Sequence, residues 1–560
     1  MKHSLKIFCL VFLFLTGSCS LTDLDENLEN PNQVGVGNLD VNLLMNKIQL
    51  DFADFVTESN EPSMELSRMI ALLGGDVYER AYQPQFHNDI WERGYQDVLN
   101  QIETLLPKTD AAGLTVLSGS ARVMKAYVLL TLVDLFGDVP YSEALKGSEG
   151  EANFNPHTDP GKSVYEAAIA ILDEAIANLG TATVGNAAAR DIYYGHSAAK
   201  WTAFANTLKL KAYLNLRLTD AAGAKTKIEE LLTKDLIDTD AEEFTYKYGA
   251  VDNPARSRHP LYRQMYQPAA GAADGYLSNY YMLITYKQKG VEDPRWRYYF
   301  FRQVGSIATA IADEPESIPC LIAPRPSHYG PDQAWCAFDP GFFGRDHGNS
   351  DGIPPDSRAL TCFGVYPAGG LSDTNLDNPA LQKLTQAGQG ANGAGIEPIW
   401  MASFTEFLKA EAALTLSTTC DAAALLESAV KKSIKRVRDF ATAKGQALPA
   451  GLEPSETDYV SAVNALYAGA ATPDAKLDVL TKENYIALWG NGIEAYNMYR
   501  RTGKPSDIQP MRAVNPGSFI RSLLYPADLV NLNSSVPQKP TPGVNITKVF
   551  WDNNPDNLFK

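Results

Sequence analysis

A glycine-rich stretch, Gly341–Gly370, gathers side chains that could bind a cation. Asp346, Asn349 and Asp351 place oxygen donors within six residues of one another, and His347 adds ring nitrogens. Calcium takes several oxygen ligands from a flexible loop, although this spacing differs from that of helix–loop–helix calcium sites. Asp and Asn also bond to nearby backbone in ordinary turns. A Ca²⁺ site is therefore one hypothesis, and a polar turn with a hydrogen-bonded His347 is the simpler one; no other cofactor is expected.

Aromatic side chains in the same part of the chain could bind a carbohydrate. Sugars present C–H groups, and the face of an aromatic ring is the negative side of its quadrupole, so exposed flat rings suit stacking. Each ring must be weighed against burial in a core, which is the more common place for aromatic residues. Trp335 and Tyr329 are the strongest candidates because Pro, Gly and polar residues flank them. The other candidate rings are Phe338, Phe342, Phe343, Tyr262 and Tyr266.

Catalytic motifs are not apparent in the sequence. It contains no HExxH helix, no Walker-type phosphate loop, no dinucleotide-binding motif and no GxSxG elbow joining a strand to a helix. A glycosidase requires two carboxylates about 5 Å or about 6.5–9.5 Å apart. With 66 acidic residues such a pair could exist, but no segment marks one. We therefore predict a binding protein without catalytic residues and retain a surface glycoside hydrolase as an alternative.

The composition describes a folded, acidic protein. Apolar residues make up 45% of the chain and aromatic residues 10%, which is ordinary for a globular protein. The formal net charge is −17, and removal of a leader that carries Lys2 and Lys6 would make it −19. A charge of this sign repels phosphate backbones, so nucleic acid is excluded as a general partner.

The first eighteen residues have the order of an export signal. Lys2 and Lys6 precede the apolar run Ile7–Leu15, and small residues then lead to Cys19. The order resembles the lipobox of bacterial lipoproteins, in which the cysteine becomes the lipidated N-terminal residue, although Leu15 stands one position earlier than is usual. The alternative is an ordinary secreted protein. No later apolar run reaches eighteen residues, so no membrane-spanning segment is predicted beyond the leader.

Four cysteines remain after the leader and Cys19. They are Cys320, Cys336, Cys362 and Cys420. An exported chain permits disulfides, and four cysteines allow three pairings. Cys336 and Cys362 bracket the glycine-rich loop, so a Cys336–Cys362 disulfide is our hypothesis, with buried free thiols as the alternative. No CxxC spacing supports a zinc site.

The elements that must position these residues are mostly helices. Between Ala121 and Phe136 apolar residues cover most of a helix circumference, which predicts a central core helix that ends at Gly137 before Pro140. The predicted helices span residues 40–57, 62–73, 85–106, 121–136, 163–179, 196–217, 221–233, 274–288, 399–417, 421–443, 456–468 and 480–501. Residues 241–397 are rich in Gly and Pro, and long irregular segments in folded domains usually carry function.

Four segments together resemble one protein family. Leu135–Ala144 reads LFGDVPYSEA, and His196–Arg217 contains Trp201, Phe204, Ala205 and Asn206 followed by a Leu-Lys-Leu run. The acidic, alanine-rich helix 399–417 and the stretch 485–503, YIALWGNGIEAYNMYRRTG, follow in the same order. Their order and spacing are similar to those of the SusD/RagB family of nutrient-binding outer-membrane lipoproteins.

The resemblance implies a fold, a location and a partner. The fold would be mainly α, with residues 40–560 forming one domain on a tetratricopeptide-like scaffold and residues 241–397 forming a ligand-binding face. Residues 1–18 would be the signal peptide and 19–39 a lipidated tether to the outer leaflet, facing the cell exterior. The protein would capture an oligosaccharide or other nutrient as the lid of a SusC-like, TonB-dependent transporter barrel. A tetratricopeptide-like scaffold that binds only protein is a further alternative.

Overall fold

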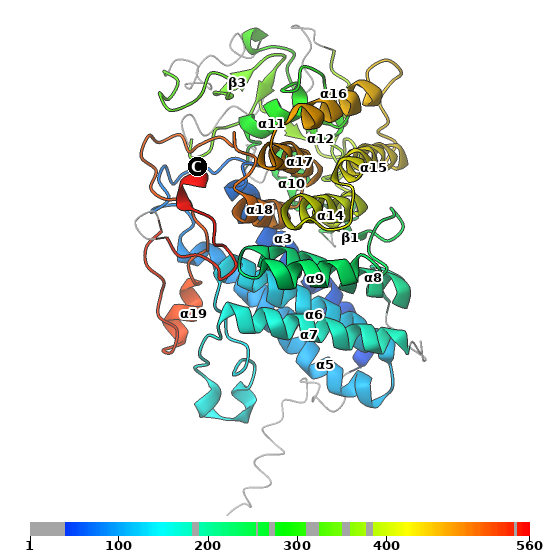
Figure 1. Cartoon of the computed structure of the whole chain (residues 1–560), viewed down its shortest axis with the longest axis vertical. Helices are drawn as coiled ribbons and strands as arrows, with labels where there is room; N and C mark the ends of the chain where they lie inside the picture. Colours follow the sequence, from blue (N-terminus) through cyan, green and yellow to red (C-terminus); the bar gives the residue numbers. More distant parts are fainter. Residues whose placement is uncertain are drawn as a thin grey trace, which may run out of the picture.

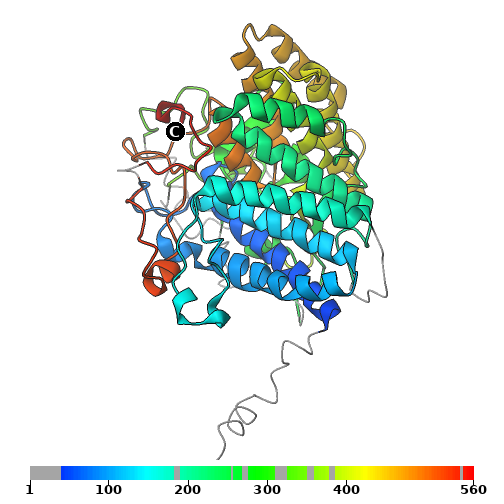
Figure 2. The ribbon, with the colours of Figure 1, turned by 60° about the horizontal axis from the view of Figure 1, so that its bottom comes forward.

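The computed structural model describes residues 40–181, 190–253, 256–267, 275–309, 324–349, 359–376, 385–542 and 546–560. The predicted signal peptide, the tether and Cys19 lie outside these residues. Within them, helices pack side by side in a large scaffold, and a layer of loops and short elements covers one end of it (Figures 1 and 2).

Helix α6 (Thr115–Phe136) is the core helix that the sequence predicts. Every residue from Val116 to Phe136 is buried except Arg122 and Lys125. Gly137 ends the helix with a φ of 80°, a conformation that glycine adopts without steric cost. The helix is long and apolar enough to cross a membrane, but 89% of its most apolar stretch is buried inside the protein, as expected of a core helix.

The scaffold consists of helices that pack against their neighbours in sequence. Helices α5 to α9 form one stack and α14 to α17 a second, and α18 packs against α3. At the crossing of α6 and α7, Gly119 lets the helices approach so closely that an added Cβ would lie 2.6 Å from Leu179. The helices are α3 (Val41–Leu66), α5 (Asn100–Ala111), α7 (Gly161–Gly180), α8 (Ala198–Asn215), α9 (Ala221–Leu231), α14 (Ala402–Leu416), α15 (Ala422–Ala443), α16 (Glu456–Gly469), α17 (Pro473–Ala487), α18 (Gly492–Thr502) and α19 (Ala527–Leu532). The predicted mainly α, tetratricopeptide-like scaffold with loop-rich insertions is confirmed.

Several predicted boundaries are wrong. Helix α3 continues through Pro62, because burial of Met64 and Leu66 in the core outweighs the backbone hydrogen bond that proline cannot make. The predicted helix 85–106 instead begins with η2 (Pro84–His87) and α4 (Asn88–Trp91), passes through a π-helical stretch, η3 (Glu92–Leu99), and ends in α5. The predicted helix 480–501 is two helices, because Gly490 adopts a φ of 92° and Asn491 caps the N-terminus of α18.

The loop-rich layer contains short helices and three two-stranded antiparallel ribbons. The helices are α10 (Pro260–Tyr266), α11 (Asn279–Tyr286) and α12 (Trp296–Tyr299). The ribbons pair β1 (Phe244–Lys247) with β6 (Ile396–Trp400), β2 (Phe300–Phe301) with β5 (Cys362–Phe363), and β3 (Ala337–Phe338) with β4 (Phe342–Phe343). The β1–β6 ribbon pairs the start of the loop-rich segment with its end, next to the helical scaffold. The β3–β4 ribbon lies at the far end of the layer from α5 and α7 (Figure 1).

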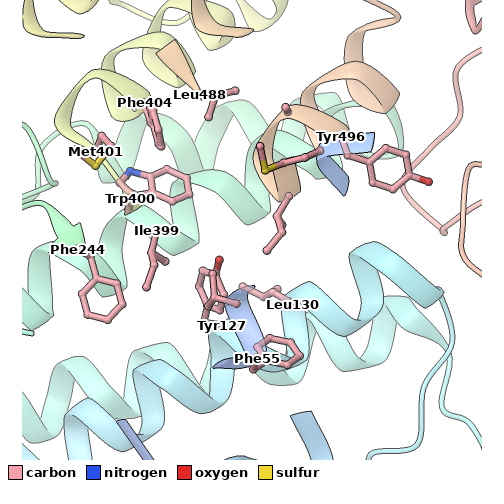
Figure 3. Close-up of a cluster of buried hydrophobic side chains, with 14 of the residues drawn as sticks. Phe55, Tyr127, Leu130, Phe244, Ile399, Trp400, Met401, Phe404, Leu488 and Tyr496 are labelled. Atoms are coloured by element: carbon pink, nitrogen blue, oxygen red, sulfur yellow. The ribbon is translucent and has the colours of Figure 1, made fainter. Parts of the chain in front are cut away.

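One hydrophobic core connects the two helical stacks with the base of the loop layer. Its centre is aromatic: the ring of Phe244 stacks on Phe204 at 4.2 Å and on Tyr193 at 4.4 Å between centroids. Figure 3 shows Phe244 from β1, Tyr127 from α6 and Tyr496 from α18 around the same interior. Rings in such contact add about 0.5–1.5 kcal/mol per pair beyond the area that they bury.

A charged network crosses the centre of the scaffold. The Lys211 ammonium group on α8 lies 3.2 Å from the Asp134 carboxylate on α6 and 2.5 Å from that of Glu494 on α18. All three side chains are almost fully buried. Burial alone would lower the pKa of Lys211, but the two carboxylates raise it above its ordinary value. Asp134 also accepts hydrogen bonds from Tyr165, Asn497 and Trp551.

We expect Lys211→Met to destabilise the protein by about 3–5 kcal/mol, because it leaves two buried carboxylates without a cation. Urea denaturation followed by circular dichroism measures the effect. Lys209→Met is the matched control on the same helix: its partner Asp173 is largely exposed, and the loss should stay below about 1 kcal/mol. Equal losses in the two variants would contradict a stabilising role for the buried network.

Candidate ligand-binding face

Buried ion pairs fix the loop layer in one geometry. Arg302, which directly follows β2, is fully buried, and its Nε donates to the Asp373 carboxylate at 2.7 Å. Its Nη1 donates at 2.7 Å to the carbonyl oxygen of Pro340, in the turn between β3 and β4. A charge-assisted hydrogen bond away from water is strong and directional, so this one guanidinium holds three loops together.

Trp335 is a partly exposed ring on this fixed layer. The edge of Tyr329 meets it, with centroids 5.9 Å apart, and the Arg512 guanidinium lies 5.8 Å from its centroid. The Tyr329 hydroxyl donates to the carbonyl oxygen of Pro510 at 3.1 Å, and Arg512 Nη1 donates to Asn349 Oδ1 at 3.0 Å. The indole therefore has neighbours that hold its orientation. We call the surface formed by Trp335, Tyr329 and Arg512 the Trp335 face.

A cavity of about 420 Å³ lies near the Trp335 face: His328, which lines it, contacts the Tyr329 ring with 5.0 Å between centroids, but Trp335, Tyr329 and Arg512 are not among its lining residues. It lies between His328, the loop 510–519 and the C-terminal residues Asp556–Lys560. His328 Nε2 donates to the carbonyl oxygen of Met511 at 2.8 Å, whereas its buried Nδ1 has no hydrogen-bond partner. Cavities of roughly 300–1,000 Å³ are typical of small-ligand sites, so this one is large enough to hold a small ligand.

The sequence did not indicate that Arg512, His328 and the loop that carries Met511 lie at the candidate site. Arg512 lies far from the glycine-rich loop in sequence, yet its backbone amide donates to the His347 carbonyl at 2.8 Å. A signal was present in the segment 510–518, PMRAVNPGS, which combines Pro, Gly and polar residues and is therefore typical of a loop. It did not show that this segment faces Trp335.

Four of the predicted ligand-binding rings are core residues, so the prediction for them is wrong. Tyr262 and Tyr266 stack on each other at 4.4 Å and are buried. Phe342 and Phe343 are also buried. Phe338 is half-buried and stacks on Phe342 at 4.7 Å. Phe342 packs against Tyr286 and Trp296, and Phe343 packs against Val304 and Cys336, so both faces of β4 are covered.

Of the two preferred rings, Trp335 remains the candidate that a ligand can reach. Tyr329 is only 7% exposed. Its contribution is therefore to support the indole rather than to present its own face. The stacking role predicted for Trp335 stays a prediction.

Two of the three predicted calcium ligands, Asp346 and Asn349, accept hydrogen bonds from other parts of the protein. Both oxygens of the buried Asp346 carboxylate accept hydrogen bonds, from the Cys336 amide at 2.8 Å and from Gln509 Nε2 at 2.7 Å. Asn349 Oδ1 accepts from Arg512, and Asp351 lies outside the described residues. Among the residues that the structure describes, no group of three His, Cys, Asp or Glu side chains could hold a metal ion. Asp346 acts as a structural acceptor that ties the loop to the segment containing Gln509.

His347 is not the hydrogen-bonded turn residue that the sequence predicts. Its ring is fully buried, neither nitrogen has a hydrogen-bond partner, and the centroid lies 6.1 Å from that of Tyr78. Burial, together with the nearby Arg68 charge, holds the pKa of His347 well below its ordinary value. The imidazole is therefore neutral at physiological pH.

The hypothesis of a Cys336–Cys362 disulfide is wrong. Cys336 is disulfide-bonded, but Cys362 is a free thiol, and so is Cys420. The partner of Cys336 is therefore none of the described cysteines. Cys362 lies in β5, where it pairs with Phe301 of β2, and its side chain is buried. Burial raises the pKa of the Cys362 thiol to about 12.

Comparison with protein families now places the chain. A family model described as "Starch-binding associating with outer membrane" matches residues 31–311, half of the chain, and one described as "Susd and RagB outer membrane lipoprotein" matches residues 378–551. The chain belongs to the SusD/RagB family. The resemblance carried by the four sequence segments is thereby confirmed. Trp335 and Tyr329 lie between the two matched regions of this SusD-family protein.

Solved SusD-family structures share the fold. A chitin-binding SusD homolog from Flavobacterium johnsoniae is 18% identical, with a TM-score of 0.62 over 92% of this chain and 100% of that one. SusD homologs from Bacteroides ovatus and Bacteroides uniformis are each 19% identical, with TM-scores of 0.62 and 0.60. They cover 92% and 91% of this chain, and each is itself covered to 99%. No curated protein matches the chain.

We expect iodoacetamide to alkylate Cys420 in the native protein and to leave Cys362 unmodified. Cys420 is partly exposed, whereas Cys362 is buried and its raised pKa suppresses the reactive thiolate. Peptide mass spectrometry reads both sites. Unfolding without reductant should expose Cys362, and Cys336 should react only after reduction. Alkylation of Cys336 in non-reduced protein would contradict its disulfide.

Proposed function

We propose that this SusD-family protein binds an oligosaccharide at the Trp335 face. The observation that carries the proposal is a partly exposed indole held by Tyr329 and Arg512. A cavity of about 420 Å³ lies nearby, lined by His328, whose ring contacts Tyr329. A fixed ring loses little conformational entropy when a sugar stacks on it, and the nearby cavity can take neighbouring sugar units. The starch-binding description of the family and the chitin-binding homolog from Flavobacterium johnsoniae support a glycan as the ligand.

We further propose that the protein acts at the outer membrane as the lid of a SusC-like transporter. Membership in a family of outer-membrane lipoproteins supports an acyl anchor at Cys19 and a flexible tether over residues 19–39. A lipid-anchored protein of this kind cannot itself carry cargo across the bilayer, so a barrel must do so. Capture on a lid raises the ligand concentration at the barrel mouth, and closure encloses the ligand between two surfaces.

Hydrolysis is the less favoured function. Among the described residues that line the cavity, Asp556 is the one acidic side chain, and it pairs with Arg521 at 2.7 Å. A glycosidase needs two carboxylates on opposite sides of the scissile bond. A scaffold that binds only protein would leave the arrangement of Trp335 and the cavity without a role.

We expect Trp335→Ala to weaken binding of the cognate oligosaccharide at least tenfold, as loss of one stacking ring should cost about 1.5 kcal/mol or more. A glycan panel screened by affinity electrophoresis identifies the ligand, and titration calorimetry then measures its affinity for wild-type and variant protein. Trp335→Phe should retain much of the affinity. Phe154→Ala, which removes an aromatic ring that is 59% exposed in the connection between α6 and α7, should change nothing. A large drop in melting temperature with unchanged affinity would instead make Trp335 a packing residue.

If Cys19 carries the acyl anchor, the Cys19→Ala variant produced in the native host should no longer be found in the membrane fraction. Wild-type protein, solubilised in mild detergent, should co-purify with a protein of transporter-barrel size, because the anchor keeps lid and barrel in one membrane. Fractionation, immunoblotting and mass spectrometry measure both effects. A Cys19→Ala protein that stays in the membrane would place the anchor elsewhere, and recovery of wild type only as a free monomer would favour a stand-alone binder.

A further inference from the structure

A second cavity lies in the helical scaffold, away from the Trp335 face. Its volume is about 410 Å³, and its walls come from η3, α5, α6 and the segment 140–149. Helix α5 lies at the opposite end of the molecule from the β3–β4 ribbon, which follows Trp335 in sequence (Figure 1). No residue lines both this cavity and the one beside His328. We call the second one the scaffold cavity; its volume is typical of a small-ligand site.

The scaffold cavity has an apolar floor and two aromatic walls. Leu99 and Leu129 line it and are almost fully buried, so they form its floor. Tyr95 and Tyr141 also line it, and both are partly exposed. Exposed flat rings suit the C–H groups that a sugar presents. The cavity therefore offers the kinds of surface that the apolar face of a sugar ring can cover.

Hydrogen bonds hold both tyrosines in place. The Tyr95 hydroxyl donates to the carbonyl oxygen of Pro140 at 2.6 Å, and its ring packs against Trp91 with 4.7 Å between centroids. The backbone amide of Tyr141 donates to the Asp159 carboxylate at 2.8 Å, which ties this part of the loop to the start of α7. Since the tyrosines are held before a ligand arrives, binding would cost little conformational entropy.

The charged side chains that line the scaffold cavity balance one another. Glu103 and Glu149 supply two carboxylates, and Lys125 and Lys146 supply two ammonium groups. Lys125 pairs with Glu103, and Lys146 Nζ donates to the carbonyl oxygen of Ser142 at 2.7 Å. This local balance contrasts with the formal net charge of −17 on the whole chain.

The balance of charge disfavours ionic ligands. The two carboxylates repel an anion while the two ammonium groups attract it, so an anionic ligand gains little. A zwitterion needs opposite charges that are separately available, but Lys125 and Glu103 already neutralise each other. A neutral ligand with many hydroxyl groups can accept hydrogen bonds from ammonium groups and donate them to carboxylates. An oligosaccharide combines such hydroxyl groups with apolar ring faces.

We propose that the scaffold cavity is a second binding site for a neutral oligosaccharide. A sugar ring stacks on Tyr141, and its hydroxyl groups form hydrogen bonds with Glu149 and Lys146. The proposal rests on the proposed function in that both sites take the same class of nutrient. Two sites on one protein can hold a polysaccharide at two points, which raises the apparent affinity for the polymer above that for a short oligomer.

The test uses the full chain with Trp335→Ala, so that the remaining binding reports the scaffold cavity. The probes are maltoheptaose and chitohexaose, which are neutral, and trigalacturonic acid, which is anionic. Ala144 lines the cavity, so Ala144→Trp in this background should fill it and weaken binding of at least one neutral probe at least tenfold in titration calorimetry. Ala152→Trp is the matched control: Ala152 lies in the same connection between α6 and α7, is exposed and does not line the cavity. It should leave the affinity unchanged.

A milder pair of variants tests the stacking ring itself. Tyr141→Ala should weaken binding of the same probe about tenfold, whereas Tyr141→Phe, which keeps the ring, should retain most of the affinity. Melting temperatures check that each variant is folded. The proposal is overturned if neither neutral probe binds the Trp335→Ala protein, or if Ala144→Trp binds as tightly as Ala152→Trp. Binding of trigalacturonic acid that Ala144→Trp abolishes would also overturn it, because the ligand would then be an anion.

The same variants separate this inference from the proposed function. If Trp335→Ala abolishes binding and Ala144→Trp alone has no effect on the otherwise wild-type protein, the Trp335 face is the binding site and the scaffold cavity is not. If binding is lost with Ala144→Trp and unchanged with Trp335→Ala, the scaffold cavity is the binding site and the Trp335 face is not.

Discussion

The structure depends on one buried cation shared by distant parts of the chain. Lys211 lies between carboxylates on α6 and α18, helices from opposite ends of the sequence. The same network continues to Arg501, which donates to Asn215 Oδ1 at 2.6 Å and pairs with Glu411 on α14. Apolar packing alone tolerates rotation or sliding of helices, whereas these bonds fit one register. We infer that the network selects the relative positions of the two helical stacks.

Buried ion pairs also fix the positions of the segments in the loop layer. This layer has little regular structure, so hydrogen bonds between backbone groups cannot fix its shape. Hydrogen bonds from buried arginine side chains hold its segments in place instead. Arg302 joins the end of β2 to the β3–β4 turn and to the segment that contains Asp373. Arg295 similarly bonds Asp293 and reaches Ser433 on α15 at 2.9 Å. A binding face built from loops can then be as rigid as one built from strands, which favours tight binding at low entropic cost.

Much of the fold could be predicted because helical periodicity is a local property. Apolar spacing identified α7 and α8 to within two residues at each end, and Gly137 marked the end of α6, which begins at Thr115 rather than at the predicted Ala121. Boundaries failed where tertiary packing overrode local preference, as at Pro62, or where one glycine divided a continuous apolar pattern, as at Gly490.

The candidate site was less accessible to sequence reasoning. Flanking polar residues pointed to Trp335, but nothing local showed that Arg512 would lie against it or that Phe342 and Phe343 would turn inward. Acidic residues near glycines suggested a metal loop, yet Asp346 is consumed by hydrogen bonds to Cys336 and Gln509. These contacts join residues that are far apart in the sequence, and local sequence patterns do not predict such contacts.

The composition of α6 also bears on how the protein reaches its destination. For a chain that we propose to be exported, a stretch apolar enough to cross a bilayer risks being retained in the inner membrane during translocation. Arg122 and Lys125 lie near the middle of that helix, where each charged residue opposes insertion by about 2.5–3.5 kcal/mol. In the folded protein they form peripheral ion pairs with Asp110 and Glu103. We therefore expect Arg122 and Lys125 to matter more during secretion than in the folded protein, because their charges oppose insertion of this helix into the membrane.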